Sequence, residues 1–318
     1  MNKENVLLQA NHIKKYFQGR GKNVVKAVDD VSLTLHRGET LGLVGESGCG
    51  KSTLGRALLR LIEPTQGEIL YNGQDLRKLP EREMRLMRQH MQMVFQNPYS
   101  SLNPRMTVLE SVRAPLDIFK IGTPEERFEK CREIMKYVGF EEYQIYRYPH
   151  EFSGGQRQRV VIARALISDP DFIVCDEPVS ALDVSVRAQV LNLMRDINEK
   201  RGLAYLFISH DLSVVKHVSD RIAVMYLGNL VELAECEELY RNPKHPYTKA
   251  LLSSIPIPDP DVMVERIPLE GDLPSPMNPP SGCRFHTRCP YAKERCRTER
   301  PQFQYDQKGH GAACHMCE

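Results

Sequence analysis

Short apolar runs alternate with helical patterns along the chain. Four runs have the length and composition of buried strands, at residues 41–44, 91–95, 172–175 and 204–208. Apolar residues recur at helical spacing over 52–62, 125–138 and 185–201. Strands that alternate with helices in this way predict an α/β protein with a mostly parallel core sheet.

Two other stretches depart from this alternation. Residues 7–35 show short apolar alternations that predict antiparallel strands, and Asn72-Gly73 predicts a hairpin turn. Residues 97–168 change to proline-punctuated loops and helices, which indicates an inserted helical subdomain. We therefore expect one main domain over 1–242 and an extension over 243–318, in which ten of the 21 prolines fall within 243–280 and favour an extended connector.

Charge and hydropathy restrict the possible classes of protein. The 43 Lys and Arg against 41 Asp and Glu leave a net charge of +2, which argues against a dedicated nucleic-acid binder. No apolar run approaches the roughly 20 residues that cross a bilayer. Residues 1–17 lack the apolar core of a secretion signal, so we expect a cytosolic protein.

The clearest motif lies between the run at 41–44 and the helix that follows. It reads G-x-x-x-x-G-K-[ST], the pattern of a phosphate-binding loop, whose glycines let backbone N–H groups point at phosphate oxygens. In this pattern Lys51 is placed for the β- and γ-phosphates and Ser52 for magnesium. The loop, called the phosphate loop below, comprises Gly45, Glu46, Ser47, Gly48, Cys49, Gly50, Lys51, Ser52 and Thr53.

A second potential anion-binding helix terminus opens at Ser153, Gly154, Gly155 and Gln156. One nucleotide in a monomer does not need two such termini. The strand at 172–175 ends in an acidic pair, Asp176-Glu177, placed for catalysis at the carboxyl edge of a parallel sheet.

Three further side chains fit a nucleotide site. The strand at 91–95 leads to Gln96, and the strand at 204–208 leads to His210 near the acidic pair. Tyr16 is the candidate for stacking on a base, with Phe17 second and a packed core aromatic as the alternative.

Together these motifs resemble, in their order, the motif set of ABC-transporter ATPases. Ser180-Ala181-Leu182-Asp183 completes the set, and phrases such as Val94-Phe95-Gln96-Asn97-Pro98 resemble the ATP-binding subunits of bacterial dipeptide and oligopeptide importers. One departure is Phe152, where the family signature most often has leucine.

The resemblance implies roles for the matched residues. Two such domains would pair head to tail, so that the helix at Ser153 of one closes on the γ-phosphate held by the other. Glu177 would polarise the attacking water, His210 would contact the γ-phosphate, and Asp183 would belong to the nucleotide site. Magnesium would be held by Ser52, Gln96 and Asp176.

The resemblance also implies partners. It predicts a second, related ATPase subunit, two integral membrane permease subunits and, indirectly, an extracytoplasmic binding protein, with this chain peripheral on the cytoplasmic face of the inner membrane. Nickel uptake by the same subfamily stays open as an alternative. A nucleic-acid-acting ABC ATPase is the other alternative, although such proteins usually carry two ATPase domains or a long coiled coil.

Five of the nine cysteines fall in the last 36 positions. Gaps of five, six and seventeen residues separate Cys283, Cys289, Cys296 and Cys314, and this spacing favours a metal site over free thiols but fits paired zinc knuckles poorly. His286 or His315 could substitute in a zinc site. The family resemblance implies a [4Fe–4S] cluster on these four cysteines, with Cys317 as the alternate fourth ligand.

Overall fold

The computed structural model describes residues 5–19, 23–255 and 266–317 of the 318-residue chain. The chain divides into two compact units. Unit 1 comprises residues 1–35, 40–77 and 208–318, and unit 2 comprises residues 36–39 and 78–207.

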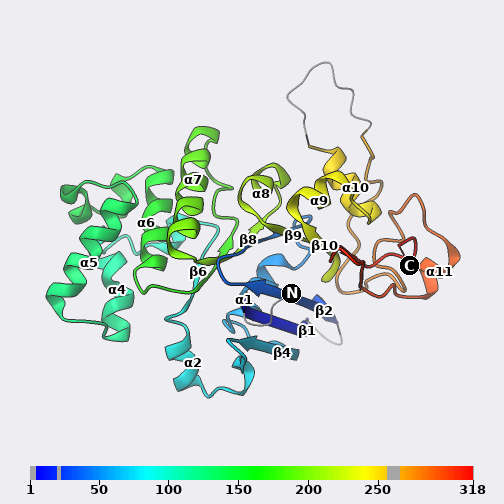
Figure 1. Ribbon diagram of the computed structural model, residues 1–318, viewed down its shortest axis with the longest axis horizontal. Helices are drawn as coiled ribbons and strands as arrows, with labels where there is room; N and C mark the ends of the chain where they lie inside the picture. The colour runs from blue at the N-terminus through cyan, green and yellow to red at the C-terminus, as the bar shows by residue number, and fades with distance from the viewer. Residues whose placement is uncertain (1–4, 20–22, 256–265, 318) are drawn as a thin grey trace. The chain divides into compact units, whose positions relative to one another are not determined.

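Unit 1 contains an antiparallel sheet near the N-terminus, in the order β2-β1-β4-β5. Figure 1 shows β1, β2 and β4 side by side in blue and cyan. Asn72 and Gly73 form the predicted turn between β4 and β5, each with a positive φ, as a tight hairpin requires. The strands are β1 (Val6–Gln18), β2 (Val24–His36), β4 (Gln66–Tyr71) and β5 (Gln74–Asp75).

A second group of strands in unit 1 is centred on β9, which pairs in parallel with β3 and antiparallel with β10. Two short strands near the C-terminus extend this group, because β12 pairs with β10 and β11 with β12. Residues 304–305 and 311–312 of the C-terminal extension therefore belong to a sheet. These strands are β3 (Thr40–Val44), β9 (Arg221–Tyr226), β10 (Asn229–Glu235), β11 (Gln304–Tyr305) and β12 (Gly311–Ala312).

The helices of unit 1 include one where the sequence favours an extended connector. Pro246 occupies the first turn of α10, where its missing N–H costs nothing, and His245 accepts the N–H of Tyr247 as a cap. Part of the proline-rich stretch is thus helical. The helices are α1 (Lys51–Leu58), α8 (Leu212–Val218), α9 (Cys236–Arg241), α10 (Pro246–Ser253) and α11 (Glu294–Thr298).

Unit 2 combines parallel strands with a group of helices. β6 (Met91–Val94) and β7 (Phe172–Asp176) are parallel, and β8 (Ala204–Ser209) lies next to β7, so the predicted parallel core is confirmed here. The helices are α2 (Glu81–Met87), α3 (Pro98–Ser101), α4 (Val108–Phe119), α5 (Pro124–Tyr137), α6 (Gly154–Leu166) and α7 (Val184–Arg201).

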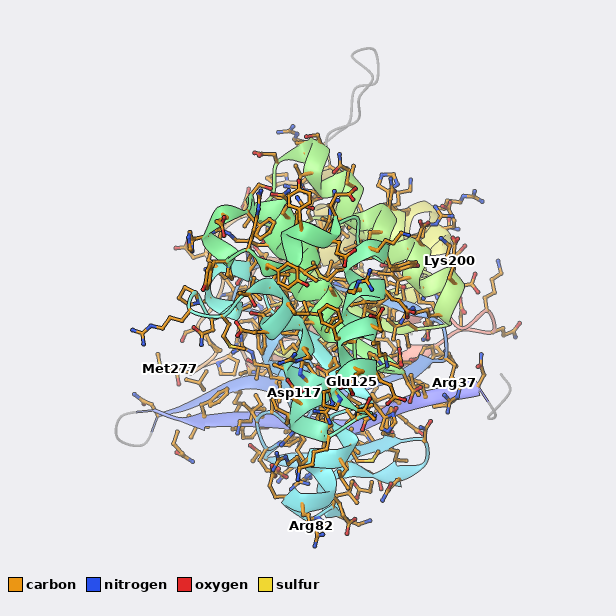
Figure 2. All side chains as sticks on the ribbon, turned by 90° about the vertical axis from the view of Figure 1, so that its left-hand side faces the viewer. Arg37, Arg82, Asp117, Glu125, Lys200 and Met277 are labelled. Carbon is orange, nitrogen blue, oxygen red and sulfur yellow. The ribbon has the colours of Figure 1, made fainter. Side chains whose placement is uncertain are left out.

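The helices α4, α5 and α6 pack on one another through apolar faces, and their other faces carry charge. Figure 2 labels Asp117 on α4 and Glu125 on α5, on the side of unit 2 that faces the viewer. Asp117 pairs with Arg113 and with Arg127 of α5, which joins the two helices at their surface. Among the described residues no helix has the length and hydropathy needed to cross a membrane.

A buried hydrogen bond attaches the C-terminal strands to the rest of unit 1. Glu232 on β10 lies 2.7 Å from Nε2 of His310, and both side chains are at most 1% exposed. The same carboxylate accepts the backbone N–H groups of Lys244 and His245. Burial favours the neutral carboxyl, but these hydrogen bonds outweigh it and lower the pKa of Glu232.

We expect Glu232→Ala to lower the free energy of unfolding by about 3 kcal/mol, because it leaves His310 and two buried N–H groups without their acceptor. The folded-state pKa of Glu232 is depressed, so this stabilisation is present above the ordinary glutamate pKa of 4.5 and is lost as the pH falls through the folded-state pKa. Denaturant titration at pH 7 and pH 4 measures both effects. Glu299→Ala, which removes an exposed pair with Arg295, is the control, and equal stability of the two variants at pH 7 would contradict the prediction.

Candidate functional site

The phosphate loop follows directly from a buried strand and ends in a helix. Every residue of β3 is buried, and its register with β9 places Leu43 opposite Ala223. The loop then leads into α1, which begins at Lys51. Strand, glycine-rich loop and helix thus occur in the arrangement that the motif predicts.

Two glycines of the loop are required by close backbone contacts. A Cβ on Gly45 would lie 2.1 Å from the carbonyl oxygen of Met225, and one on Gly50 would lie 2.0 Å from that of Ala27. Both residues also have a positive φ, at 151° and 106°. Because the obstacles are backbone atoms, no side-chain rotation would make room for a larger residue.

Lys51 and the N-terminus of α1 make the phosphate loop suited to bind an anion. Lys51 is 5% exposed, and its ammonium donates to the carbonyl oxygens of Gly45 at 2.8 Å and Glu46 at 2.9 Å. Gly50 caps α1 without a side-chain hydrogen bond. The first N–H groups of α1 and its dipole therefore favour negative charge, as at a phosphate site. Cys49 in this loop is buried, which raises the pKa of its thiol.

Tyr16 and His210 are the other predicted site residues of unit 1. Tyr16 is half-buried and donates its hydroxyl to Asp29, while His210 is exposed after β8. Burial and the hydrogen bond to Asp29 raise the pKa of Tyr16 to about 12. Burial of Asp29 acts in the opposite sense to its hydrogen bonds from Tyr16 and Arg284, which prevail and lower its pKa.

Two of the predicted site residues of unit 2, Gln96 and Glu177, are in contact. Gln96, just beyond β6, donates from Nε2 to Oε2 of Glu177 at 2.8 Å. Glu177 has a positive φ of 49° directly after β7, and Asp176 at the end of that strand is buried. The side-chain amide therefore holds the carboxylate that follows the strand, a geometry in which Glu177 can act as a base.

The Ser153 helix is formed as predicted at α6. Ser153 and Gln156 form a capping box, in which Gln156 accepts the N–H of Ser153 at 3.0 Å. A Cβ on Gly155 would lie 2.0 Å from Cγ1 of Val186, so a larger residue there would require Val186 to move. Asp183 is the N-cap of α7.

Four cysteines of the C-terminal extension surround one small cavity. Cys283, Cys289, Cys296 and Cys314 all line it together with residues such as His286 and His315, and Cys317 does not. Burial raises the pKa of Cys283 to about 11 and raises that of Cys289. Within residues 5–19, 23–255 and 266–317, no group of three or more His, Cys, Asp or Glu side chains is arranged to hold a metal ion. The iron–sulfur assignment therefore stays a prediction.

The same extension contacts the phosphate loop, which the sequence did not indicate. Arg288 forms two hydrogen bonds to the carboxylate of Glu46, at 2.7 and 3.2 Å, and these bonds raise its pKa further. Arg284 pairs with Asp29 at 2.7 Å. Arg284 follows Cys283 and Arg288 precedes Cys289, but an arginine beside a cysteine carries no recognisable signal of this contact.

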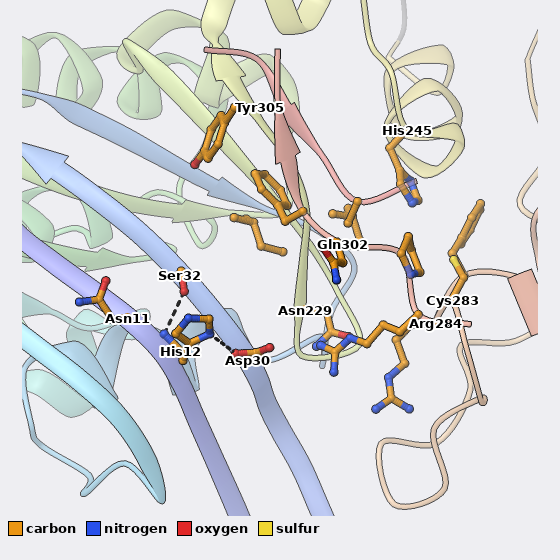
Figure 3. A pocket seen from close by; sticks show the side chains of 17 residues that line it. Asn11, His12, Asp30, Ser32, Asn229, His245, Cys283, Arg284, Gln302 and Tyr305 are labelled. Atoms are coloured by element: carbon orange, nitrogen blue, oxygen red, sulfur yellow. Dashed lines mark hydrogen bonds and ion pairs between the residues drawn. The ribbon is translucent and has the colours of Figure 1, made fainter. Parts of the chain in front are cut away.

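A larger cavity of about 730 Å³ lies in unit 1, between the N-terminal sheet, β10 and the extension. Figure 3 shows its labelled residues, with His12 hydrogen-bonded to Asp30 and Ser32, and Arg284 beside Cys283. Residues 45–53 do not line this cavity. It is therefore separate from the phosphate loop.

We expect Gly50→Ala to weaken nucleotide binding by at least about tenfold, because its methyl group would overlap a backbone carbonyl and displace the loop. Gly73→Ala is the matched control, since Gly73 also has a positive φ but has open space around it. Both variants share a backbone strain of about 1 kcal/mol. Titration with a fluorescent ATP analogue and magnesium measures the affinity, and equal dissociation constants for the two variants would show that the close contact has no effect.

Comparison with known proteins gives two family matches on this chain. Residues 28–180 match the ABC transporter family, and residues 231–296 match the oligopeptide/dipeptide transporter C-terminal region. The oligopeptide transport ATP-binding protein AppF of Bacillus subtilis is 53% identical over 98% of each chain. YkfD of the same bacterium is 55% identical over 98% of this chain and 95% of its own.

Solved structures share the fold. The dimeric ATP-binding cassette MJ0796, in a post-hydrolysis state bound to ADP and Pi, has a TM-score of 0.66 at 30% identity and covers 72% of this chain and 99% of its own. The cbiO1 protein of Clostridium perfringens has a TM-score of 0.67 at 24% identity and covers 75% of this chain and 92% of its own.

Proposed function

This chain belongs to the ATP-binding proteins of ABC transporters and hydrolyses ATP to drive transport, and we propose that its transported substrate is a peptide entering through a membrane permease. The observation that carries the peptide assignment is the match of residues 231–296 to the oligopeptide/dipeptide transporter C-terminal region. The near full-length identity to AppF supports it. The chain would then lie on the cytoplasmic face of the membrane, against two permease subunits.

In the proposed nucleotide site the phosphate loop binds ATP. Lys51 and the N–H groups at the start of α1 would neutralise the phosphates, and Ser52, Asp176 and Gln96 would hold magnesium. Tyr16 stacks on the adenine. The cradle required by Gly45 and Gly50 supports this role, because only a backbone without Cβ atoms can approach so closely.

Hydrolysis is an in-line attack of water on the γ-phosphate. Glu177, held by Gln96, accepts a hydrogen bond from the attacking water and draws its proton away. His210 contacts the γ-phosphate. The positive charge of Lys51 and of magnesium balances the charge that grows on the phosphoryl oxygens.

We propose that a second, related ATPase subunit completes each site. Its helix corresponding to α6 would present a serine and glycines to the γ-phosphate bound here, and α6 of this chain, with Asp183 nearby in sequence, would serve the partner's nucleotide. The dimeric structure of MJ0796 bound to ADP and Pi supports a two-subunit arrangement in this fold.

We also propose a [4Fe–4S] cluster on Cys283, Cys289, Cys296 and Cys314. The placement of all four around one cavity supports it, and Cys317 does not line that cavity. An iron–sulfur cluster would supply iron–thiolate bonds that cross-link the segments carrying these cysteines.

We expect Glu177→Gln to retain ATP binding and to slow hydrolysis by about 10²–10⁴-fold, because the amide keeps the shape but cannot act as a base. The variant is assembled with the permease, the binding protein and a partner ATPase that carries its own equivalent substitution, so that only this site is measured. ATP hydrolysis and uptake of a labelled peptide are followed together. Undiminished hydrolysis by the variant would refute the role of Glu177, and uptake of nickel without peptide by the unaltered complex would refute the substrate.

For the cluster, anaerobically purified protein should be brown and contain about four iron atoms per chain. Cys289→Ser should lose the colour and the iron. Cys317→Ser is the matched control and should retain both, because Cys317 lies outside the cavity that the other four line. Stoichiometric zinc in colourless anaerobic protein would overturn the iron assignment.

A further inference from the structure

The segment at residues 283–289, called the cysteine loop below, packs behind the phosphate loop. Its Phe285 is 1% exposed and meets Tyr226 at 5.2 Å between ring centroids and Tyr247 at 5.4 Å. Tyr226 is the last residue of β9, the strand that pairs with β3. An aromatic cluster therefore fixes the cysteine loop against the strand pair that supports the phosphate loop.

Every polar group of Glu46 is held in this arrangement. Its backbone N–H donates to the hydroxyl of Tyr247 at 2.9 Å, and its carbonyl oxygen accepts from Lys51 at 2.9 Å. Its carboxylate accepts two hydrogen bonds from Arg288. The contacts from Tyr247 and Arg288 come from residues C-terminal to 242, so the extension helps to fix the conformation of the loop residue next to Gly45.

The ion pair of Arg288 and Glu46 differs from the surface pairs of the chain. The side chain of Arg288 is 5% exposed and that of Glu46 is 28% exposed, and the pairing is bidentate. Partly buried, two-point pairs of this kind are stronger and more directional than exposed single-point pairs. Arg295 and Glu299 of the same extension form such an exposed pair, at 53% and 59%.

The charges of Arg288 and Glu46 affect nucleotide binding. ATP brings several negative charges to the loop, and the Glu46 carboxylate would repel them. The repulsion is weakly screened because water is partly excluded between the groups. Arg288 neutralises that carboxylate and fixes its direction. Removing the guanidinium leaves an uncompensated negative charge beside the anion site, which is worse for ATP than having neither charge.

At the other end of the cysteine loop a second arginine forms a similar ion pair. Arg284 pairs with Asp29, which accepts the hydroxyl of Tyr16, the residue proposed to stack on adenine. Figure 3 shows Arg284 next to Cys283. Both arginines of the cysteine loop thus contact elements of the proposed nucleotide site.

We propose that Arg288 is a positioning residue for the phosphate loop, through which the cysteine-bearing extension sets the affinity of this chain for magnesium–ATP. The inference rests on the proposed binding of ATP by residues 45–53. Arg288 itself touches Glu46 and not the nucleotide. Its effect is therefore on binding, transmitted by the conformation and charge of Glu46.

The test is a titration of the full-length, anaerobically purified chain with a fluorescent ATP analogue and magnesium. We expect Arg288→Ala to raise the dissociation constant about tenfold, the size of one charge-assisted hydrogen bond. Arg288→Lys keeps the charge without the two-point geometry and should give a smaller rise. Arg295→Ala is the matched control and should bind as the unaltered chain does.

A second substitution separates positioning from general damage. In the double variant E46Q/R288A the orphaned carboxylate is gone, so affinity should recover to within about threefold of the unaltered chain. Thermal unfolding without nucleotide identifies any misfolded variant. If Arg288→Ala is misfolded, the dissociation constant of E46Q/R288A is compared with that of the unaltered chain. An unchanged dissociation constant for Arg288→Ala, or equal weakness of the single and double variants, overturns the inference. Failure of the unaltered chain to bind the analogue overturns the phosphate-loop assignment instead.

Discussion

The close approach of the phosphate loop to neighbouring backbone is the constraint on which the rest of unit 1 depends. Gly45 and Gly50 bring the loop against the carbonyl oxygens of Met225 and Ala27, which belong to different sheets. The shape of the loop therefore depends on strands of both sheets. The anion-binding helix terminus, the buried Lys51 and the contacts of Glu46 all follow from that shape.

The C-terminal extension is integrated with this arrangement. β12 pairs with β10, and the buried pair of Glu232 and His310 fastens it there. Phe285 packs against Tyr226 at the end of β9, and Arg288 hydrogen-bonds to Glu46, the second residue of the phosphate loop. The described residues of the extension pack on the sheet of unit 1, since their own apolar residues are too few to form a core.

Unit 2 provides the groups that the loop does not. The carboxylate of Glu177 is oriented by Gln96, and Gly155 allows α6 to approach Val186. The proposed roles in water activation and in the partner's site thus belong to strands and helices of unit 2. In the proposed dimer one chain would serve two nucleotides.

The sequence alone determined the features that depend on neighbouring residues. Strand, loop and helix at residues 41–58, the turn at Asn72-Gly73 and the Ser153 cap are local, because their geometry is set by glycine, asparagine and serine within a few positions. The family resemblance added the roles of residues such as Glu177. Only the tertiary structure decided that α10 is helical, that the last strands join β10, and that Arg288 holds Glu46. Those contacts join residues as many as 242 positions apart, and a surface arginine and a buried one look the same in sequence because burial is decided by what packs against them.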